Sequence, residues 1–245
     1  MSSSTPPLLQ VSSLHVHLGG RDIVQDVSFS LTVGERVGII GPNGSGKTTL
    51  FNSLSGFLPV SAGSITFRER EISTLPPHRR AQLGLGRVFQ NFGIFREMSV
   101  FENMLLAVES NRKIPKRRRQ STVAEYLDLV DLLEKQKDKA GSLSGGQMRL
   151  LEIARTLAVG AELLLLDEPT AGVSPKLKDS VRNLLVHASD NKRTIVVIEH
   201  DMGFIGQLCD RILVLDVGRL VLDGPPDEIR SSQKVHEIYF GDAHA

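Results

Sequence analysis

The first part of the chain alternates apolar and polar side chains with a period of two. Leu14–Leu18 and Asp26–Leu31 both follow this alternation, which is typical of antiparallel strands with one buried face. Residues 19–22, Gly-Gly-Arg-Asp, have the composition of a turn. A third strand is predicted over Arg36–Ile40, and residues 1–9 are predicted to be a flexible tail. The pattern therefore predicts an N-terminal antiparallel β subdomain.

Helical spacing replaces this alternation further along. A helix is predicted to begin near Lys47, with Leu50, Phe51 and Leu54 facing inward. Residues 97–140 are also helix-periodic, and they are more charged than their neighbours. The apolar stripes of that region consist of Val100, Met104, Leu105 and Val108, then Tyr126, Leu127, Val130 and Leu133.

Short, continuous apolar runs return in the second half of the chain. They are Leu163–Leu166, Thr194–Ile198 and Ile212–Leu215. Apolar runs of this length, bounded by turns and separated by helical segments, are typical of parallel strands covered on both faces. The sequence therefore predicts an α/β core with a mainly parallel sheet, interrupted by a helical insertion at about residues 92–158. It contains no evident internal repeat.

Length and composition exclude several classes of protein. The 245 residues, of 26.8 kDa, fit one large α/β domain or two closely packed lobes. The net charge of +1 and the absence of Trp argue against a nucleic-acid partner. The single cysteine, Cys209, excludes an intramolecular disulfide and a multi-cysteine metal site. We interpret it as a buried, inert thiol.

Neither a secretory signal nor a membrane span is evident. The first residues lack a basic start and an apolar run, and no stretch approaches the roughly 18 apolar residues that a span requires. We expect a soluble, cytoplasmic protein that works at a membrane only through a partner.

Residues 41–48 fit the phosphate-binding loop pattern G-x-x-x-x-G-K-[ST], with a predicted strand before them and a predicted helix after them. In such a loop, backbone N–H groups and the helix N-terminus bind phosphate oxygens. The lysine neutralises the β- and γ-phosphates, and the hydroxyl of the last residue is offered to Mg²⁺. The predicted nucleotide-binding residues are Gly41, Pro42, Asn43, Gly44, Ser45, Gly46, Lys47, Thr48 and the adjacent Thr49.

Two carboxylates follow the apolar run Leu163–Leu166. The carboxyl end of a parallel strand beside a phosphate loop is where a metal ligand belongs. We therefore expect Asp167 to hold Mg²⁺ through a water molecule. Glu168 is expected to polarise the water that attacks the γ-phosphate.

A second anion-binding corner is predicted at Leu143–Gln147, Leu-Ser-Gly-Gly-Gln, which precedes another apolar-periodic helix. One chain does not need two phosphate corners around one nucleotide. We therefore expect a dimer, in which Ser144, Gly145, Gly146 and Gln147 close on ATP held by the other subunit.

Together these three motifs resemble the ATP-binding subunit of an ABC transporter, and the resemblance covers nearly the whole chain. It implies a P-loop NTPase core with an N-terminal antiparallel β subdomain and an inserted helical subdomain. The expected organisation is one ABC ATP-binding domain over residues 1–245. Its core lobe spans about 10–91 and 159–245, and its helical subdomain spans about 92–158. The implied cofactors are ATP and Mg²⁺.

The resemblance also implies roles for three further positions. Gln90, in Val-Phe-Gln-Asn, resembles the loop glutamine that contacts Mg²⁺ and signals to membrane subunits. His200 resembles the switch histidine that contacts the γ-phosphate, and residues 171–174 resemble the loop that crosses the dimer interface. The catalytic set so implied is Glu168, His200, Gln90 and Lys47, and the metal set is Thr48, Gln90 and Asp167.

Two positions depart from the family pattern. Many members stack an aromatic residue on adenine where this chain has Leu18. Leu18 shares a strand face with Leu14 and Val16, so a core role for it stays open. The interface loop commonly ends in Asp and here ends in Ser174. The first departure affects the expected base selectivity, and the second affects the expected coupling across the interface.

Within the superfamily, the match narrows to the ATPases of branched-chain amino acid importers, a group that also serves other neutral amino acids, amides and urea. The motifs that resemble it are residues 93–100, Leu151–Arg155, Ile198–Met202 and the tail Ile238–Gly241. Implied partners are a related second ATPase subunit, two transmembrane permease subunits and, indirectly, a periplasmic binding protein. The implied location is peripheral, on the cytoplasmic face of the inner membrane. Alternatives are a urea or amide importer, the lipopolysaccharide-export ATPase and, further off, a soluble non-transport ABC ATPase.

Overall fold

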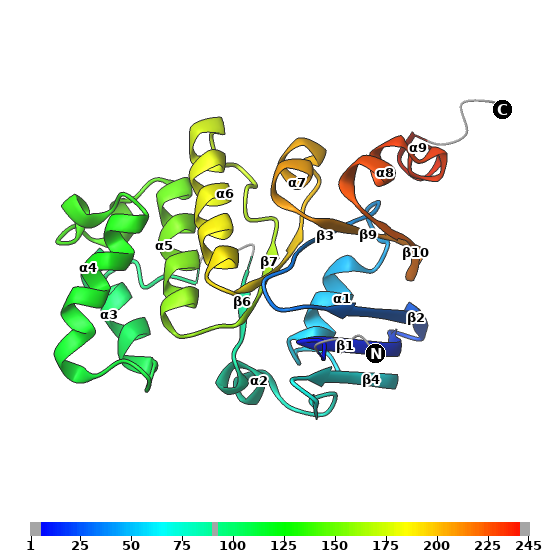
Figure 1. Ribbon diagram of the computed structural model, residues 1–245, viewed down its shortest axis with the longest axis horizontal. Helices are drawn as coiled ribbons and strands as arrows, with labels where there is room; N and C mark the ends of the chain where they lie inside the picture. Colours follow the sequence, from blue (N-terminus) through cyan, green and yellow to red (C-terminus); the bar gives the residue numbers. More distant parts are fainter. Residues whose placement is uncertain (1–5, 90–92, 241–245) are drawn as a thin grey trace, which may run out of the picture.

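Two β-sheets form the centre of the computed structural model, which describes residues 6–89 and 93–240 (Figure 1). The larger sheet has six strands in the order β10-β9-β3-β8-β7-β6. The strands from β9 to β6 are parallel, as predicted, and β10 pairs with β9 in the antiparallel sense. The strands are β3 (Arg36–Ile40), β6 (Leu85–Val88), β7 (Leu163–Asp167), β8 (Thr194–Ile198), β9 (Arg211–Asp216) and β10 (Arg219–Gly224).

The central strands of this sheet are apolar throughout because both of their faces are covered. In β7, Leu164 and Leu166 pack into one hydrophobic core, and Leu163 and Leu165 pack into the other. The first core contains helices α3, α5, α6 and α7, and the second contains α1 and the smaller sheet. This alternation explains the continuous apolar runs in the sequence.

The smaller sheet is antiparallel, with the order β2-β1-β4-β5. The predicted tail over residues 1–9 is wrong at its end, because Leu8 is buried and β1 begins at Leu9, which pairs with Leu31. Both N-terminal strands are longer than predicted. The strands are β1 (Leu9–Leu18), β2 (Arg21–Leu31), β4 (Ala62–Phe67) and β5 (Arg70–Glu71).

Helices pack on both faces of the larger sheet. Three of the described α-helices lie between β6 and β7 in the sequence, where the helical insertion is predicted. These three are α3 (Val100–Ser110), α4 (Arg119–Leu129) and α5 (Gly145–Ala158), and Figure 1 places α3 and α4 at one end of the molecule. The division into a core lobe and a helical subdomain stays a prediction. The other helices are α1 (Lys47–Leu54), α2 (Pro77–Leu83), α6 (Pro175–Asp190), α7 (Met202–Leu208), α8 (Pro226–Ser231) and α9 (Gln233–Phe240), with 3₁₀ turns at Lys116–Arg118, Leu133–Lys135 and Ala140–Ser142.

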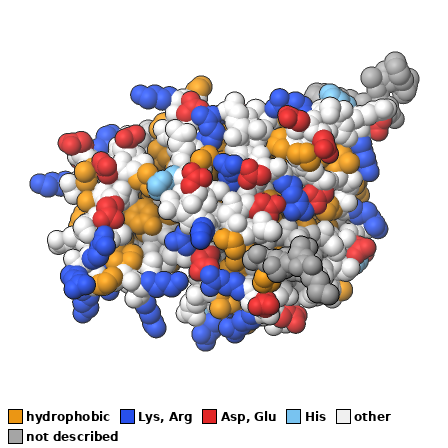
Figure 2. Space-filling model, viewed as in Figure 1, with side chains coloured by type: hydrophobic (Ala, Val, Ile, Leu, Met, Phe, Trp, Pro, Cys, Tyr) orange, Lys and Arg blue, Asp and Glu red, His pale blue; other side chains and the backbone are white. Residues whose placement is uncertain are grey.

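Cys209 is buried at the C-terminal end of α7, as predicted. Burial raises the pKa of its thiol to about 12, so the reactive thiolate is scarce at neutral pH. On the molecular surface, basic and acidic side chains are interspersed over the face shown in Figure 2. Within the described part of the chain, no helix is long and apolar enough to cross a bilayer.

Candidate nucleotide-binding site

The predicted phosphate loop connects the end of β3 to the start of α1, which begins at Lys47 as expected. Gly41 adopts φ +153°, and a Cβ there would collide with the carbonyl of Leu215. At Gly46, with φ +100°, a Cβ would lie 2.8 Å from the carbonyl oxygen of Ile23. Only glycine therefore allows this chain path, which turns the loop tightly over the first turn of α1.

Lys47 lies folded back beneath the loop and is only 7% exposed. Its Nζ donates hydrogen bonds to the carbonyl oxygens of Gly41 (2.8 Å) and Pro42 (2.9 Å). Burial lowers the pKa of the ammonium group, whereas the charges of Glu168 and Asp167 raise it. A buried cation is thus held at the point where the loop, β7 and the acidic residues meet.

The side chains around the loop fit a nucleotide with Mg²⁺. Ser45 Oγ is buried, and no described residue is its hydrogen-bond partner, so an outside acceptor or donor would satisfy it. Thr48 is exposed at the start of α1, and Asp167 ends β7. One hydroxyl and one carboxylate, completed by phosphate oxygens and water, are the ligands that Mg²⁺ takes in such sites. The described residues contain no cluster of three or more His, Cys, Asp or Glu side chains suited to a metal.

Asp167 is almost fully buried and forms an ion pair with Arg87, whose Nη2 lies 3.1 Å from Asp167 Oδ2. Burial raises the pKa of the Asp167 carboxyl, and the positive charge of Arg87 opposes that rise. Arg87 is itself buried, and its pKa is lowered mainly by desolvation. Since each charge compensates the other, removing either would leave the other buried without its counter-charge.

Glu168 lies beside His200, with 3.0 Å between Glu168 Oε1 and His200 Nε2. Topology produces this contact, since β7 and β8 are parallel neighbours and end side by side. Glu168 adopts φ +48°, and its N–H donates to the carbonyl of Ile198. The turn after β7 is therefore fixed to the end of β8, which points the two side chains at each other.

The buried Glu199 side chain stabilises this turn through hydrogen bonds. It is 4% exposed, and its Oε1 accepts hydrogen bonds from the N–H (2.8 Å) and the hydroxyl (2.6 Å) of Thr170. Its Oε2 accepts from the N–H of His200 at 3.3 Å. One buried carboxylate thus connects the segment that carries Glu168 to the segment that carries His200.

The second predicted corner starts α5. Ser144 is its N-cap, and the Ser144 and Gln147 side chains form a reciprocal capping box with each other's backbone N–H. Gly146 packs so closely against Leu177 of α6 that a Cβ would collide with it. The body of α5 packs on the opposite face of the large sheet from α1. The corner therefore belongs to a different layer of the molecule from the phosphate loop.

Sequence reasoning missed the roles of three side chains in this region: Arg87, Glu199 and Tyr239. Tyr239, on α9, accepts a hydrogen bond from the phosphate-loop N–H of Gly41 at 2.7 Å, although 198 residues separate them. Glu199 and Tyr239 lie inside stretches that carry the family resemblance, which was the available signal. Nothing in the sequence signalled the pairing of Arg87.

Other predicted positions have different outcomes. Gln90 lies outside the described residues. Leu18 is 49% exposed, whereas Leu14 and Val16 are buried, so the alternative that Leu18 is a core residue is wrong. Ser174 is the N-cap of α6 without a side-chain cap hydrogen bond.

A model of the ABC transporter family matches residues 24–171, a span that contains the phosphate loop, the α5 corner and the end of β7. The chain belongs to the ABC transporter family. With this fold and family it is an ATPase of the ABC type.

Known ABC transporter proteins align with nearly the whole chain. LivG of Salmonella typhimurium, a high-affinity branched-chain amino acid transport ATP-binding protein, is 40% identical over 97% of this chain and 99% of its own. LptB of Escherichia coli, a lipopolysaccharide export system ATP-binding protein, is 34% identical over 91% of this chain and 92% of its own. The ADP conformation of MJ1267, an ATP-binding cassette of an ABC transporter, superposes with a TM-score of 0.86 at 31% identity, covering 97% of this chain and 100% of the other.

Proposed function

We propose that this chain is the ATP-hydrolysing subunit of an importer for branched-chain or other hydrophobic or neutral amino acids. The observation that carries the proposal is the 40% identity to LivG along almost the full length of both chains. Identity to LptB is lower and covers less of each chain, which favours the importer over lipopolysaccharide export. Urea or an amide remains the alternative cargo, because this chain would not itself touch the solute.

In the proposed reaction, Gly41–Thr49 bind the triphosphate, with backbone N–H groups and Lys47 on the phosphate oxygens. Mg²⁺, held by Thr48, Asp167 and Gln90, would neutralise the charge of the β- and γ-phosphates. Glu168 accepts a proton from the attacking water as its general base. His200, 3.0 Å from Glu168, holds the carboxylate in place and can reach toward the γ-phosphate.

The second half of the site is proposed to come from a partner ATPase, a related but different chain. Ser144–Gln147 would close on the partner's nucleotide, since α5 and the chain's own α1 occupy opposite faces of the large sheet. The loop at residues 171–174 would cross the same interface.

A Gly145→Asp variant tests this assignment. The new carboxylate would face the phosphates of the partner's nucleotide, where like charges repel, while the chain's own phosphate loop is unchanged. We expect the isolated subunit to bind ATP as the wild type does in calorimetry, and ATP-dependent dimer formation with the partner ATPase to fail in gel filtration. Loss of ATP affinity in the isolated variant would place the corner in the chain's own site. Retention of both affinity and dimer formation would mean that the corner has no role in closure.

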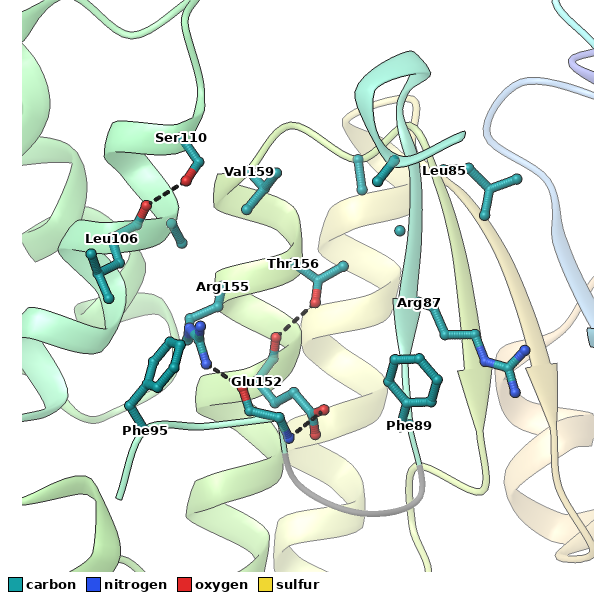
Figure 3. Close-up of a pocket in the computed structure, with 15 residues that line it drawn as sticks. Leu85, Arg87, Phe89, Phe95, Leu106, Ser110, Glu152, Arg155, Thr156 and Val159 are labelled. Carbon is teal, nitrogen blue, oxygen red and sulfur yellow. Dashed lines mark hydrogen bonds between the residues drawn. The ribbon is translucent and has the colours of Figure 1, made fainter. Parts of the chain in front are cut away.

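An apolar groove offers a docking site for the membrane partner. It has a volume of about 500 Å³ and lies between β6 on one side and helices α3 and α5 on the other (Figure 3). Four of the nine large hydrophobic side chains that the described residues leave exposed line it. These four are Phe89, Phe95, Leu106 and Val159. An apolar concentration of this kind is typical of a protein-interaction site, and we propose that a permease segment occupies it.

Charged side chains on α5 stabilise the floor of this groove. Arg155 donates to the carbonyl of Gly93 at 2.5 Å and stacks over the ring of Phe95. Glu152 accepts from the N–H of Gly93 at 3.0 Å and pairs with Arg149. Since α5 also carries the Ser144–Gln147 corner, the groove and the corner share one rigid helix. Movement of α5 on closure of the dimer would therefore be transmitted to a partner bound in the groove. The proposed location is accordingly the cytoplasmic face of the membrane, through the two permease subunits, with a periplasmic binding protein contributing indirectly.

The proposed function can be tested on the complex purified from native membranes through a tag on this chain. Reconstituted in proteoliposomes, it should take up radiolabelled leucine in an ATP-dependent manner, with urea as the comparison solute. A Leu106→Asp variant should lose the permease subunits from the purified complex, because it places a charge in the groove. Val33→Asp, at another exposed apolar position, should retain them.

Three outcomes would contradict the proposal. Purification without any permease would remove the transport role, and uptake of urea but not leucine would reassign the cargo. Co-purification with lipopolysaccharide-export components would favour the LptB-like alternative. Full retention of the permeases by Leu106→Asp would exclude the groove as their docking site and would leave the proposed transport function standing.

A further inference from the structure

A buried arginine connects three elements around the candidate metal site. The guanidinium of Arg87, at the end of the edge strand β6, donates to Asp167 Oδ2 (3.1 Å) on β7 and to Ser55 Oγ (2.8 Å). Ser55 is the C-cap of α1 and donates in turn to the carbonyl of Phe51 at 2.5 Å. The same side chain thus contacts the strand that carries the candidate metal ligand and the helix that starts at the phosphate loop.

Two aromatic rings contact this guanidinium. Its central carbon lies 5.3 Å from the centroid of the Phe51 ring and 5.2 Å from that of Phe89. Cation–π contacts gain strength when they are desolvated, and the Arg87 side chain is only 6% exposed. The planar fork can therefore satisfy Asp167 and Ser55 together in one orientation, which an ammonium group could not do as well.

The orientation of Asp167 depends on this contact. Among the described residues, Arg87 supplies the only ion pair of Asp167, and it binds Oδ2 alone. Arg87 therefore leaves Oδ1 without an ion pair, so this oxygen stays available to a metal ligand shell. Partners that orient a metal-binding carboxylate in this manner affect metal affinity even though they do not touch the metal.

Arg87 and Phe89 also line the apolar groove. Figure 3 shows Phe89, the residue that follows β6, next to Arg87 of β6, with the Arg87 side chain directed away from α5. Phe57 meets the Phe89 ring edge-on, with 5.4 Å between centroids. Two side chains that hold the Asp167 carboxylate, Arg87 directly and Phe89 through Arg87, are therefore part of the groove wall.

We infer that Arg87 is a positioning residue for the metal site, holding Asp167 in the orientation that binds Mg²⁺, with the Phe89 ring of the groove as its support. The inference rests on the proposed function, in which Asp167 is a Mg²⁺ ligand. It adds a residue that the motifs do not contain. It also connects the groove to the nucleotide site through Arg87 of β6 and the Phe89 that follows this strand.

The test compares Arg87→Lys and Arg87→Met with the wild-type protein. One readout is the Mg²⁺ concentration that supports half-maximal ATP hydrolysis. The other needs no turnover: binding of Mn²⁺ to the ATP-loaded subunit, followed by electron paramagnetic resonance. We expect both metal affinities to fall by about 10–100-fold in Arg87→Met, and to be partly retained in Arg87→Lys, which keeps the charge without the fork. ATP affinity measured in EDTA should be unchanged, because the phosphate loop is intact.

Two further variants separate positioning from stability. Arg36→Met removes another arginine–aspartate pair. Arg36 starts β3, at the end of that strand away from the phosphate loop, and pairs with Asp210 just before β9. This variant should leave both metal readouts at wild-type values. Phe89→Leu keeps an apolar side chain but removes the ring, and should weaken Mn²⁺ binding in the same direction as Arg87→Met. It serves as the test if Arg87→Met does not fold.

The outcomes distinguish this inference from the proposed function. If Arg87→Lys and Phe89→Leu both bind Mn²⁺ as the wild type does, the positioning role is wrong while the proposed function stands. If Arg87→Met loses ATP affinity in EDTA to the same extent as metal affinity, Arg87 acts only in packing. If mutation of Asp167 to Asn leaves Mn²⁺ binding unchanged, Asp167 is not a metal ligand and the proposed function itself needs revision.

Discussion

A Glu168→Gln variant is expected to bind ATP normally and to hydrolyse it about 10²–10⁴-fold more slowly, the usual contribution of a general base. The amide keeps the size of the side chain and a hydrogen bond to His200, whose Nε2 lies 3.0 Å from Glu168 Oε1, but it cannot accept the proton of the attacking water. Phosphate release under single-turnover conditions measures the loss. Gel filtration of the variant with its partner ATPase and ATP should show the closed dimer accumulating.

The control for this variant is Glu125→Gln, which neutralises an exposed carboxylate on α4 and should hydrolyse ATP at the wild-type rate. A reduction of less than about threefold in Glu168→Gln would mean that another group accepts the proton. Glu199 is the carboxylate to examine next in that event, because it lies one residue from His200 and holds the same turn.

Lys47→Ala is expected to abolish tight MgATP binding. The ammonium group is buried under the phosphate loop, and charged hydrogen bonds of this kind contribute enough that the loss should reach about 3 kcal/mol, or about 100-fold in Kd. Lys47 also donates to the carbonyls of Gly41 and Pro42, so the loop should become less ordered as well. Calorimetric titration at physiological salt measures the change in affinity.

Lys176→Ala, at an exposed position in the first turn of α6, controls for the loss of a positive charge and should keep wild-type affinity. Circular dichroism checks that Lys47→Ala is folded. Affinity near the wild-type value in a folded Lys47→Ala protein would exclude the loop from phosphate binding.

The parts of the site that lie on contiguous stretches could be predicted from the sequence. The phosphate loop is one such stretch because a glycine-rich turn between a strand and a helix needs particular residues at each position. The acidic end of β7 is another, since the apolar run marks the buried strand and the first carboxylate, Asp167, is the last residue of that strand. The same reasoning predicted the parallel sheet from Leu163–Leu166 and Thr194–Ile198, which pair directly.

Contacts made through packing could not be predicted in this way. Arg87 reaches Asp167 across 80 residues of sequence and Ser55 across 32. No local pattern records that a charged residue on an edge strand contacts two aromatic rings. The burial of Leu8 and Leu9 was missed for a similar reason. Their partners in the antiparallel sheet, such as Leu31, are set by strand register, and polar residues precede them in the chain.

Because Cys209 is buried, spectroscopic probes can be attached to an introduced cysteine without labelling the native one. It is the only cysteine, and both its enclosure and its pKa of about 12 protect the thiol from alkylating labels at neutral pH. A cysteine introduced at an exposed site, such as Val217 in the turn between β9 and β10, would therefore take up a fluorophore or spin label selectively. With a second probe on the partner subunit, interprobe distances could then be followed through the ATP cycle without first replacing the native residue.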